Sequence, residues 1–178
     1  MVTSFVQLSH PHQVSDDGET REAPIGQVQA GARQHMIIVA GPRKAITEAL
    51  VGANLLQMDF SMQNVLVVPY RTDDKKDDRE RPSGGFGGQS SYLTKPYIAR
   101  PSGDGWDEYI AEEMEDAVKQ AGENVKTEGI AMVVAYNGKV IRRGVGTVPW
   151  RKMVDELEIA ITPDAKDKKE AVDYIFDP

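Results

Sequence analysis

The sequence predicts a single α/β domain with a central mixed sheet and a C-terminal β-hairpin that is followed by a helix. Three observations support this prediction. Residues 130–136 and 139–146 have the character of strands and flank Asn137-Gly138, two residues that tolerate the positive φ of a type I′ turn. Residues 35–69 follow a strand–helix–strand pattern, and residues 106–121 form an amphipathic helix.

The strand–helix–strand pattern begins with His35–Ala40, a short apolar run of the kind found in buried central strands. Gly41-Pro42 interrupts it, and Arg43–Gln57 then carries apolar residues along one helical side. Met62–Pro69 is the second apolar run. A crossover through one helix predicts that the two strands are parallel and that the connection is right-handed.

The remaining helices have recognisable ends. Asp104 is the expected N-cap of the helix over residues 106–121, and Gly122 is expected to end it. Pro149 suits the first turn of the last helix. The apolar residues of that helix recur at helical spacing and predict one buried face, made of Trp150, Met153, Val154 and Leu157.

The domain is expected to span residues 1–160, followed by a charged tail over 161–178. Residues 2–8 predict a first strand and 25–31 its return strand. Residues 71–101 lack periodicity and are interpreted as an inserted loop, which either contacts a partner or is disordered.

Composition excludes several classes of function. The chain has 178 residues, a net charge of −7 and no cysteine, so disulfides, zinc–thiolate sites and thiol chemistry are excluded. The negative charge argues against nucleic acid as a partner, because phosphate binding needs a basic surface. No apolar run reaches the length of a membrane span, and the N-terminus lacks the pattern of a signal or transit segment.

The pattern of side chains predicts no catalytic residue, no cofactor and no metal site. His10 and His12 lie close together but lack a surrounding ligand cluster. Partner binding is the chemistry that remains, since Arg and Trp are enriched in binding hot spots. The alternative is that the strand presents a charged outer face and that Trp150 packs in the core. The predicted partner-binding residues are Arg43, Tyr92, Tyr97, Arg142, Arg143, Trp150 and Arg151.

The order of elements resembles the thioredoxin-like fold, a three-layer domain with a central mixed sheet and a C-terminal β-hairpin plus helix. An N-terminal hairpin is common in the peroxiredoxin type of that fold. Redox-active thioredoxins carry Cys-Gly-Pro-Cys-Lys after the first central strand, where this chain has residues 40–44, Ala-Gly-Pro-Arg-Lys. The usual cis-proline before the third central strand is also missing, because Glu128-Gly129 precedes Ile130. The resemblance therefore implies a domain without the redox site, which acts as a scaffold or binding module.

The C-terminal third is similar to the end of the low photosystem II accumulation family. The resemblance rests on a glycine–proline–tryptophan pattern made of Gly138, Val140, Gly144, Gly146, Pro149 and Trp150. It implies a non-catalytic assembly factor or accessory subunit of a photosynthetic membrane complex. Photosystem subunits would be its partners, and it would lie in the chloroplast on the stromal side of the thylakoid membrane.

Two alternatives remain open at this point. One is an enzyme that uses the thioredoxin-like cleft without thiols, for example with a glutathione-transferase-like activity. The other is a general protein-interaction adaptor without a photosynthetic role. A pocket near Gly41–Lys44 that is lined by tyrosine, arginine or serine would favour the enzyme.

Overall fold

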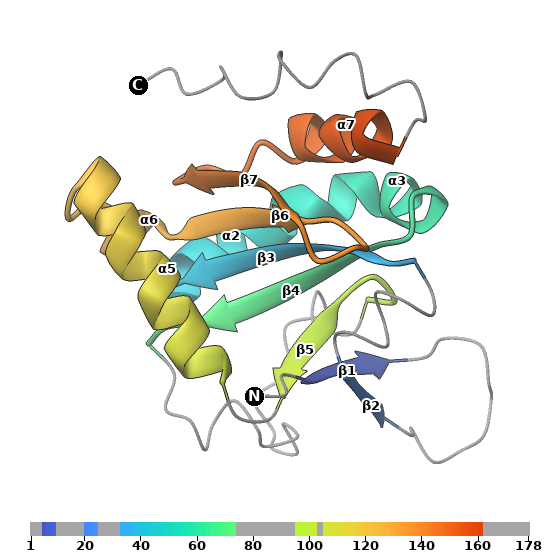
Figure 1. The fold of residues 1–178 in the computed structure, drawn as a ribbon, viewed down its shortest axis with the longest axis horizontal. Coiled ribbons are helices and arrows are strands. Elements are labelled where there is room, and N and C mark those ends of the chain that lie inside the picture. The colour runs from blue at the N-terminus through green and yellow to red at the C-terminus, as the bar shows by residue number, and fades with distance from the viewer. Residues whose placement is uncertain (1–4, 10–19, 25–32, 74–94, 103–104, 162–178) are drawn as a thin grey trace.

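Figure 1 shows the chain as a computed structural model, which describes residues 5–9, 20–24, 33–73, 95–102 and 105–161. The elements in these ranges are β1 (Phe5–Ser9), β2 (Thr20–Pro24), β3 (His35–Gly41), α2 (Arg43–Ala53), the 3₁₀ helix η1 (Asn54–Leu56), α3 (Gln57–Met62), β4 (Val65–Arg71), β5 (Ala99–Ser102), α5 (Trp106–Ala121), α6 (Val125–Glu128), β6 (Ile130–Val134), β7 (Val140–Val145) and α7 (Trp150–Ile161). The predicted tail lies almost entirely outside the described residues.

The central sheet has four strands in the order β4-β3-β6-β7. β3 and β4 are parallel, which confirms the predicted β-α-β unit, while β6 runs antiparallel to both β3 and β7. The end of β3, the start of β6 and the end of β7 therefore lie at the same edge of the sheet. A smaller antiparallel sheet has the order β2-β1-β5.

Helices cover both faces of the central sheet, and the domain has three layers (Figure 1). Ile37 and Val39 of β3 belong to the core cluster formed with α2, α3 and α7. Their neighbours Met36 and Ile38 belong to the cluster formed with α5. This alternation arises because successive strand residues point to opposite faces, and it explains why β3 is apolar throughout.

The predicted helix Arg43–Gln57 is interrupted by η1 and then continues as α3, so that β4 begins at Val65 rather than at residue 62. The added turn positions Phe60, whose side chain is fully buried. The ring of Phe60 lies 5.1 Å from that of Tyr97 and 5.6 Å from that of Trp150, centroid to centroid. Burial of this ring against the core accounts for the helical turn that local sequence preference did not reveal.

The hairpin between β6 and β7 forms as predicted, but with a different turn. Gly138 alone adopts a positive φ, of 82°, and Asn137 does not. The N–H of Ala135 donates to the carbonyl of Lys139 at 2.8 Å, so three residues form the loop. Such loops combine a type I turn with a left-handed third residue, which is the place of Gly138.

Three other boundaries differ from the predictions. The N-cap position of α5 is Gly105, with a φ of 99°, and Asp104 lies outside the described residues. β1 pairs with Thr20–Pro24, which precedes the predicted return strand over 25–31, and that predicted strand lies outside the described residues. The predicted loop 71–101 is shorter at both ends, because Arg71 belongs to β4 and Ala99 begins β5. β2 and β5 are short and polar. They are strands because their backbones pair with β1, and their sequences have no apolar periodicity that would predict them.

Candidate functional site

A cleft of about 510 Å³ opens where the end of β3 and the start of α2 meet the segments before β6 and after β7. Its walls come from three parts of the chain that are far apart in sequence. The residues that line it are Val39, Ala40, Lys44, Ala45, Glu48, Ala49, Gly52, Thr127, Glu128, Ile130, Gly146, Thr147, Val148 and Trp150. We refer to this space as the cleft.

Close backbone packing brings the first two of these segments together. A Cβ atom on Gly41 would lie 2.9 Å from the Cα of Gly129, and one on Gly129 would lie 2.6 Å from the carbonyl oxygen of Ala40. Gly146 joins the third segment, because its N–H donates to the carbonyl of Gly129 at 3.0 Å. Glycine is required here because larger residues would push the loops apart.

The N-terminus of α2 is capped by a residue from the segment that follows β4. The N–H of Arg43 donates to both carboxylate oxygens of Asp73, at 3.0 and 2.9 Å. The N–H of Thr72 donates to the carbonyl of Gly41 at 3.0 Å, which holds the end of β4 beside the helix start. Asp73 therefore places a negative charge where the helix dipole favours an anion.

Trp150 forms the apolar wall of the cleft. Its indole N–H donates to the carbonyl of Ala49 at 3.0 Å, which fixes the orientation of the ring. A Cβ atom on Gly52 would lie 3.1 Å from two atoms of the same ring. Gly52, which weakens α2 by about 1 kcal/mol relative to alanine, therefore makes room for the indole.

The side chains that line the cleft carry a net negative charge, because two carboxylates, of Glu48 and Glu128, outnumber the ammonium group of Lys44. Lys44 and Glu48 form a loose ion pair at 4.0 Å, and both side chains are largely exposed. The carboxylate of Glu128 lies beside Gly146, at 3.1 Å from the position of an added Cβ atom. Among the ion pairs of the described residues, none includes Glu128. Its carboxylate is therefore available to a ligand that enters the cleft.

The predicted basic cluster is divided between the two faces of the sheet. Arg142 and Arg143 are successive residues of β7, so their side chains point in opposite directions. Arg142 forms an ion pair with Glu156 of α7. Arg143 forms two hydrogen bonds, of 2.7 and 2.8 Å, with Glu113 of α5. Each guanidinium is thus paired with a carboxylate of the helix that covers its face.

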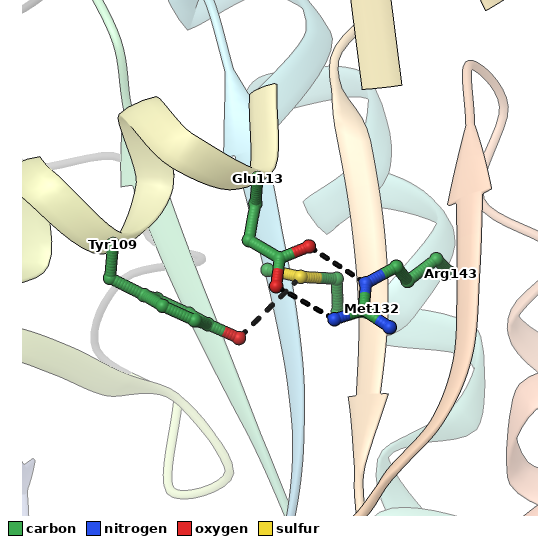
Figure 2. Close-up of polar contacts among 4 residues, drawn as sticks. All are labelled: Tyr109, Glu113, Met132 and Arg143. Atoms are coloured by element: carbon green, nitrogen blue, oxygen red, sulfur yellow. Dashed lines mark hydrogen bonds and ion pairs between the residues drawn. The ribbon is translucent and has the colours of Figure 1, made fainter. Parts of the chain in front are cut away.

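Figure 2 shows the pair on the α5 face together with Tyr109 and Met132. The hydroxyl of Tyr109 lies 3.8 Å from the sulfur of Met132. Burial, and secondarily the carboxylate of Glu113, raises the pKa of Tyr109 above its usual value. The hydrogen bond from Arg143 to Glu113 likewise raises the pKa of that guanidinium. The group therefore holds a charged arginine and a protonated tyrosine at neutral pH, as expected of a structural contact.

The other predicted partner-binding residues have varied surroundings. Trp150 and Tyr97 are buried, with exposed fractions of 7% and 5%. Arg151 forms an ion pair of 2.8 Å with Asp59. Arg43 is exposed at the start of α2, and Tyr92 lies outside the described residues. Partner binding by these residues stays a prediction, and the buried indole agrees with the alternative that Trp150 packs in the core.

No group of three or more metal-ligating side chains occurs in the parts of the chain that the structure describes. His10 and His12 fall outside those parts, so a metal site formed by them stays untested. Across the same described ranges, no helix combines the length and the apolar character that crossing a membrane requires.

The sequence pattern does not single out two residues of this region, Glu128 and Asp73. In the sequence Glu128 stands where the fold usually has a proline, and its position two residues before the buried strand β6 is the one local feature that points to it. Asp73 lies in a charged segment, and nothing in its local sequence indicates that it caps a helix 30 residues earlier. Both assignments depend on contacts between distant segments.

Comparisons with known proteins give the fold. The mitochondrial 2-Cys peroxiredoxin of Plasmodium falciparum is 13% identical over 94% of both chains, with a TM-score of 0.53. The reduced 2-Cys peroxiredoxin of Plasmodium vivax is 11% identical over 94% of this chain and 81% of the other, with a TM-score of 0.50. The yeast mitochondrial 1-Cys peroxiredoxin is 9% identical over 84% and 71%, with a TM-score of 0.51. These similarities confirm the thioredoxin-like fold.

Sequence comparison adds no family. No family model matches the chain, and no curated protein matches it. The resemblance to the low photosystem II accumulation family, the chloroplast location and the photosystem partners therefore stay predictions.

The expected function is corrected by the structural similarities. The fold that extends over most of the chain is shared with peroxiredoxins, which are enzymes. The assignments as a non-catalytic scaffold and as a non-enzyme were therefore wrong. Because the chain has no cysteine, the likeness extends to the fold and not to thiol chemistry.

Proposed function

We propose that this thioredoxin-like chain binds a small organic cation, as its substrate or ligand, in the cleft, and that it does so without thiol chemistry. The observation that carries the proposal is the carboxylate of Glu128 beside an apolar wall in a cavity of about 510 Å³. That volume falls within the range of roughly 300–1,000 Å³ that is usual for small-molecule sites.

The apolar wall supports binding of the uncharged part of the molecule. Trp150 and Val148 line one side, and Ala45 and Ala49 of α2 line another. Because the indole is held by the carbonyl of Ala49, it presents a fixed surface and needs little ordering when a ligand arrives.

The charge balance supports a cation rather than an anion. Lys44 is the one basic residue among those that line the cleft, and it already has Glu48 as a partner at 4.0 Å. Glu128 adds a second carboxylate without a basic partner in the described chain. The net charge of −7 on the whole protein raises the local concentration of cations further.

The α2 N-terminus supports the same preference. In this fold a helix that starts at the cleft could attract an anion, but Asp73 already occupies its first N–H group. An anion at this helix start would meet the carboxylate of Asp73, which lies outside the cleft lining. The carboxylates that a cation in the cleft meets are those of Glu48 and Glu128.

Isothermal titration calorimetry with two matched probes tests the proposal. Phenethylammonium and phenylacetate share a phenyl ring and carry opposite charges at pH 7. We expect phenethylammonium to bind with a Kd on the order of 1 mM, as befits so small a ligand, and phenylacetate to bind more weakly. Equal or tighter binding of phenylacetate would overturn the proposed charge preference.

Variants of two glutamates locate the binding. Glu128→Gln is expected to weaken phenethylammonium binding about threefold, which corresponds to a partly exposed ion pair. Glu123→Gln is the matched control, because Glu123 lies nearby, pairs with Lys126 and does not line the cleft. Thr147→Trp should block the cleft, whereas Thr47→Trp on the exposed side of α2 should not. Unchanged binding in Glu128→Gln and Thr147→Trp would place the ligand elsewhere and contradict the proposal.

A further inference from the structure

Of the seven methionines, Met1 lies outside the described residues and Met114 is half-buried against the α5-face core, while the other five are either buried or exposed. Met36, Met132 and Met153 are buried, with exposed fractions of 2%, 1% and 0%. Met58 and Met62, both on α3, are 68% and 82% exposed. Because the chain has no cysteine, the methionine thioethers are its only sulfur groups that an oxidant can reach.

Packing holds these two methionines on the outer side of α3. Phe60, which lies between them in sequence, is buried against Trp150 and Tyr97, and this contact fixes the rotation of the helix. Met58 and Met62 are four residues apart and therefore share a face, one turn from each other. Leu55 of η1, which is 85% exposed, precedes Met58 by three residues. We call Leu55, Met58 and Met62 the α3 patch.

From this arrangement we propose that Met58 and Met62 are a methionine oxidation site, at which a hydroperoxide converts the apolar α3 patch into a polar surface. The thioether sulfur attacks the outer oxygen of the hydroperoxide, an S–O bond forms and the O–O bond breaks. The sulfur loses two electrons and becomes a sulfoxide, and the peroxide is reduced to the alcohol, or to water from hydrogen peroxide. The proton of the hydroperoxide passes to the departing oxygen.

The structure explains why the modification is compatible with the fold. A sulfoxide is polar and disrupts packing when it forms in a core. Here the two sulfur groups lie on the exposed side of α3, while the contacts that hold the helix are made by Phe60 and by the ion pair of Asp59 with Arg151. Oxidation is therefore expected to change the surface and leave the core intact.

Peptide mapping by mass spectrometry tests the site. After exposure of the folded full chain to hydrogen peroxide, we expect Met58 and Met62 to gain 16 Da at least about tenfold faster than the three buried methionines, since the reaction follows exposure. Circular dichroism should stay unchanged. Oxidation of Met36, Met132 and Met153 at a similar rate in the folded protein would overturn the proposal.

A second measurement tests the change of surface. Oxidation should lower the binding of the apolar dye anilinonaphthalene sulfonate by the natural chain. The double variant Met58→Leu/Met62→Leu keeps an apolar patch but cannot form sulfoxides, so its dye binding should not fall. An equal fall in both proteins, or no fall in either, would contradict the conversion of the patch.

Discussion

The backbones of Gly41 and Gly129 pack directly against each other at the edge of the central sheet, where a Cβ atom on Gly41 would lie 2.9 Å from the Cα of Gly129. Gly41 ends β3, and Gly129 precedes β6. This contact positions Glu128 at one side of the cleft and α2 at the other. The shape of the cleft therefore depends on two residues that have no side chain.

Substitution of Gly129 tests this packing. Gly129→Ala is expected to lower the free energy of unfolding by more than Gly122→Ala, in urea titrations followed by circular dichroism. Both residues adopt positive φ, 79° and 90°, in a region that costs a side chain about 1–3 kcal/mol. Only at Gly129 does the added Cβ also collide with the carbonyl of Ala40, since the space around Gly122 is open. Equal losses would mean that the close approach is relaxed at no cost.

Asp73 is expected to stabilise α2 from outside the helix. Asp73→Ala should lower the free energy of unfolding by about 1 kcal/mol, because the N–H of Arg43 loses its acceptor. Asp73→Asn keeps an acceptor oxygen and should lose less. Thermal unfolding of both variants beside the natural chain checks this, and equal loss in both would show that the charge rather than the hydrogen bond matters.

The two ion pairs of β7 should differ in their contribution to stability. Glu156→Gln is expected to cost about 1–3 kcal/mol, because Arg142 and Glu156 are only 21% and 18% exposed and the charge left behind is poorly solvated. Glu113→Gln should cost at most about 1 kcal/mol, since Arg143 is 55% exposed and water can replace part of the lost contact. Chemical unfolding of the two variants gives the comparison; a larger loss for Glu113→Gln would contradict it.

His35 should make the fold sensitive to acid. Its Nδ1 accepts the N–H of Tyr136 at 3.2 Å, and burial lowers its pKa below the usual 6.5. Below pH 6.5 the unfolded chain binds a proton that the folded chain resists, so the contribution of His35 to stability is present above that pH and is lost as the pH falls below it.

Urea titrations at pH 7.5 and 5.5 measure this effect. The natural chain should lose more stability between the two values than His35→Gln, which keeps an acceptor but does not titrate. His10 and His12 are present in both proteins, so the difference belongs to His35. An equal pH dependence in the two proteins would show that His35 is readily protonated in the folded state.

The fold could be predicted because its strongest signals are local. The apolar run of β3, the single apolar face of α7 and the bounds of α5 all follow from residue spacing. The sequence did not predict the elements whose formation depends on contacts between distant residues. The segment η1–α3 is one example, because burial of Phe60 against Tyr97 extends the helical region beyond the predicted end. The polar strand β2 is another such case, since its pairing with β1 leaves no apolar pattern in its sequence.

The glycine–proline–tryptophan pattern of the last third has structural reasons within this domain. Gly138 and Gly146 adopt positive φ, of 82° and 79°. Pro149 directly precedes α7, and Trp150 forms a wall of the cleft. The pattern therefore has a structural explanation in the turns of this fold, and the family resemblance drawn from it stays a prediction.

The cleft could not be predicted residue by residue, because its lining comes from three separate segments. The cleft lies beside the Ala-Gly-Pro-Arg-Lys stretch and Lys44 lines it, but its lining contains none of the tyrosine, arginine or serine side chains that were expected to favour an enzyme. Which of the many acidic residues faces it depends on the positions of Gly129 and Gly146, which only the folded chain supplies. Arg142 and Arg143 show the opposite case, in which neighbours in sequence are separated by the sheet.

The most direct test of the proposed cleft is a titration of the ¹⁵N-labelled protein with phenethylammonium, followed by NMR of its two tryptophan indole N–H groups. Trp150 lines the cleft, whereas Trp106 is buried on the α5 face and serves as an internal reference. We predict that the Trp150 resonance shifts and saturates while that of Trp106 stays in place. A fixed Trp150 resonance, or equal shifts of both, would contradict binding in the cleft.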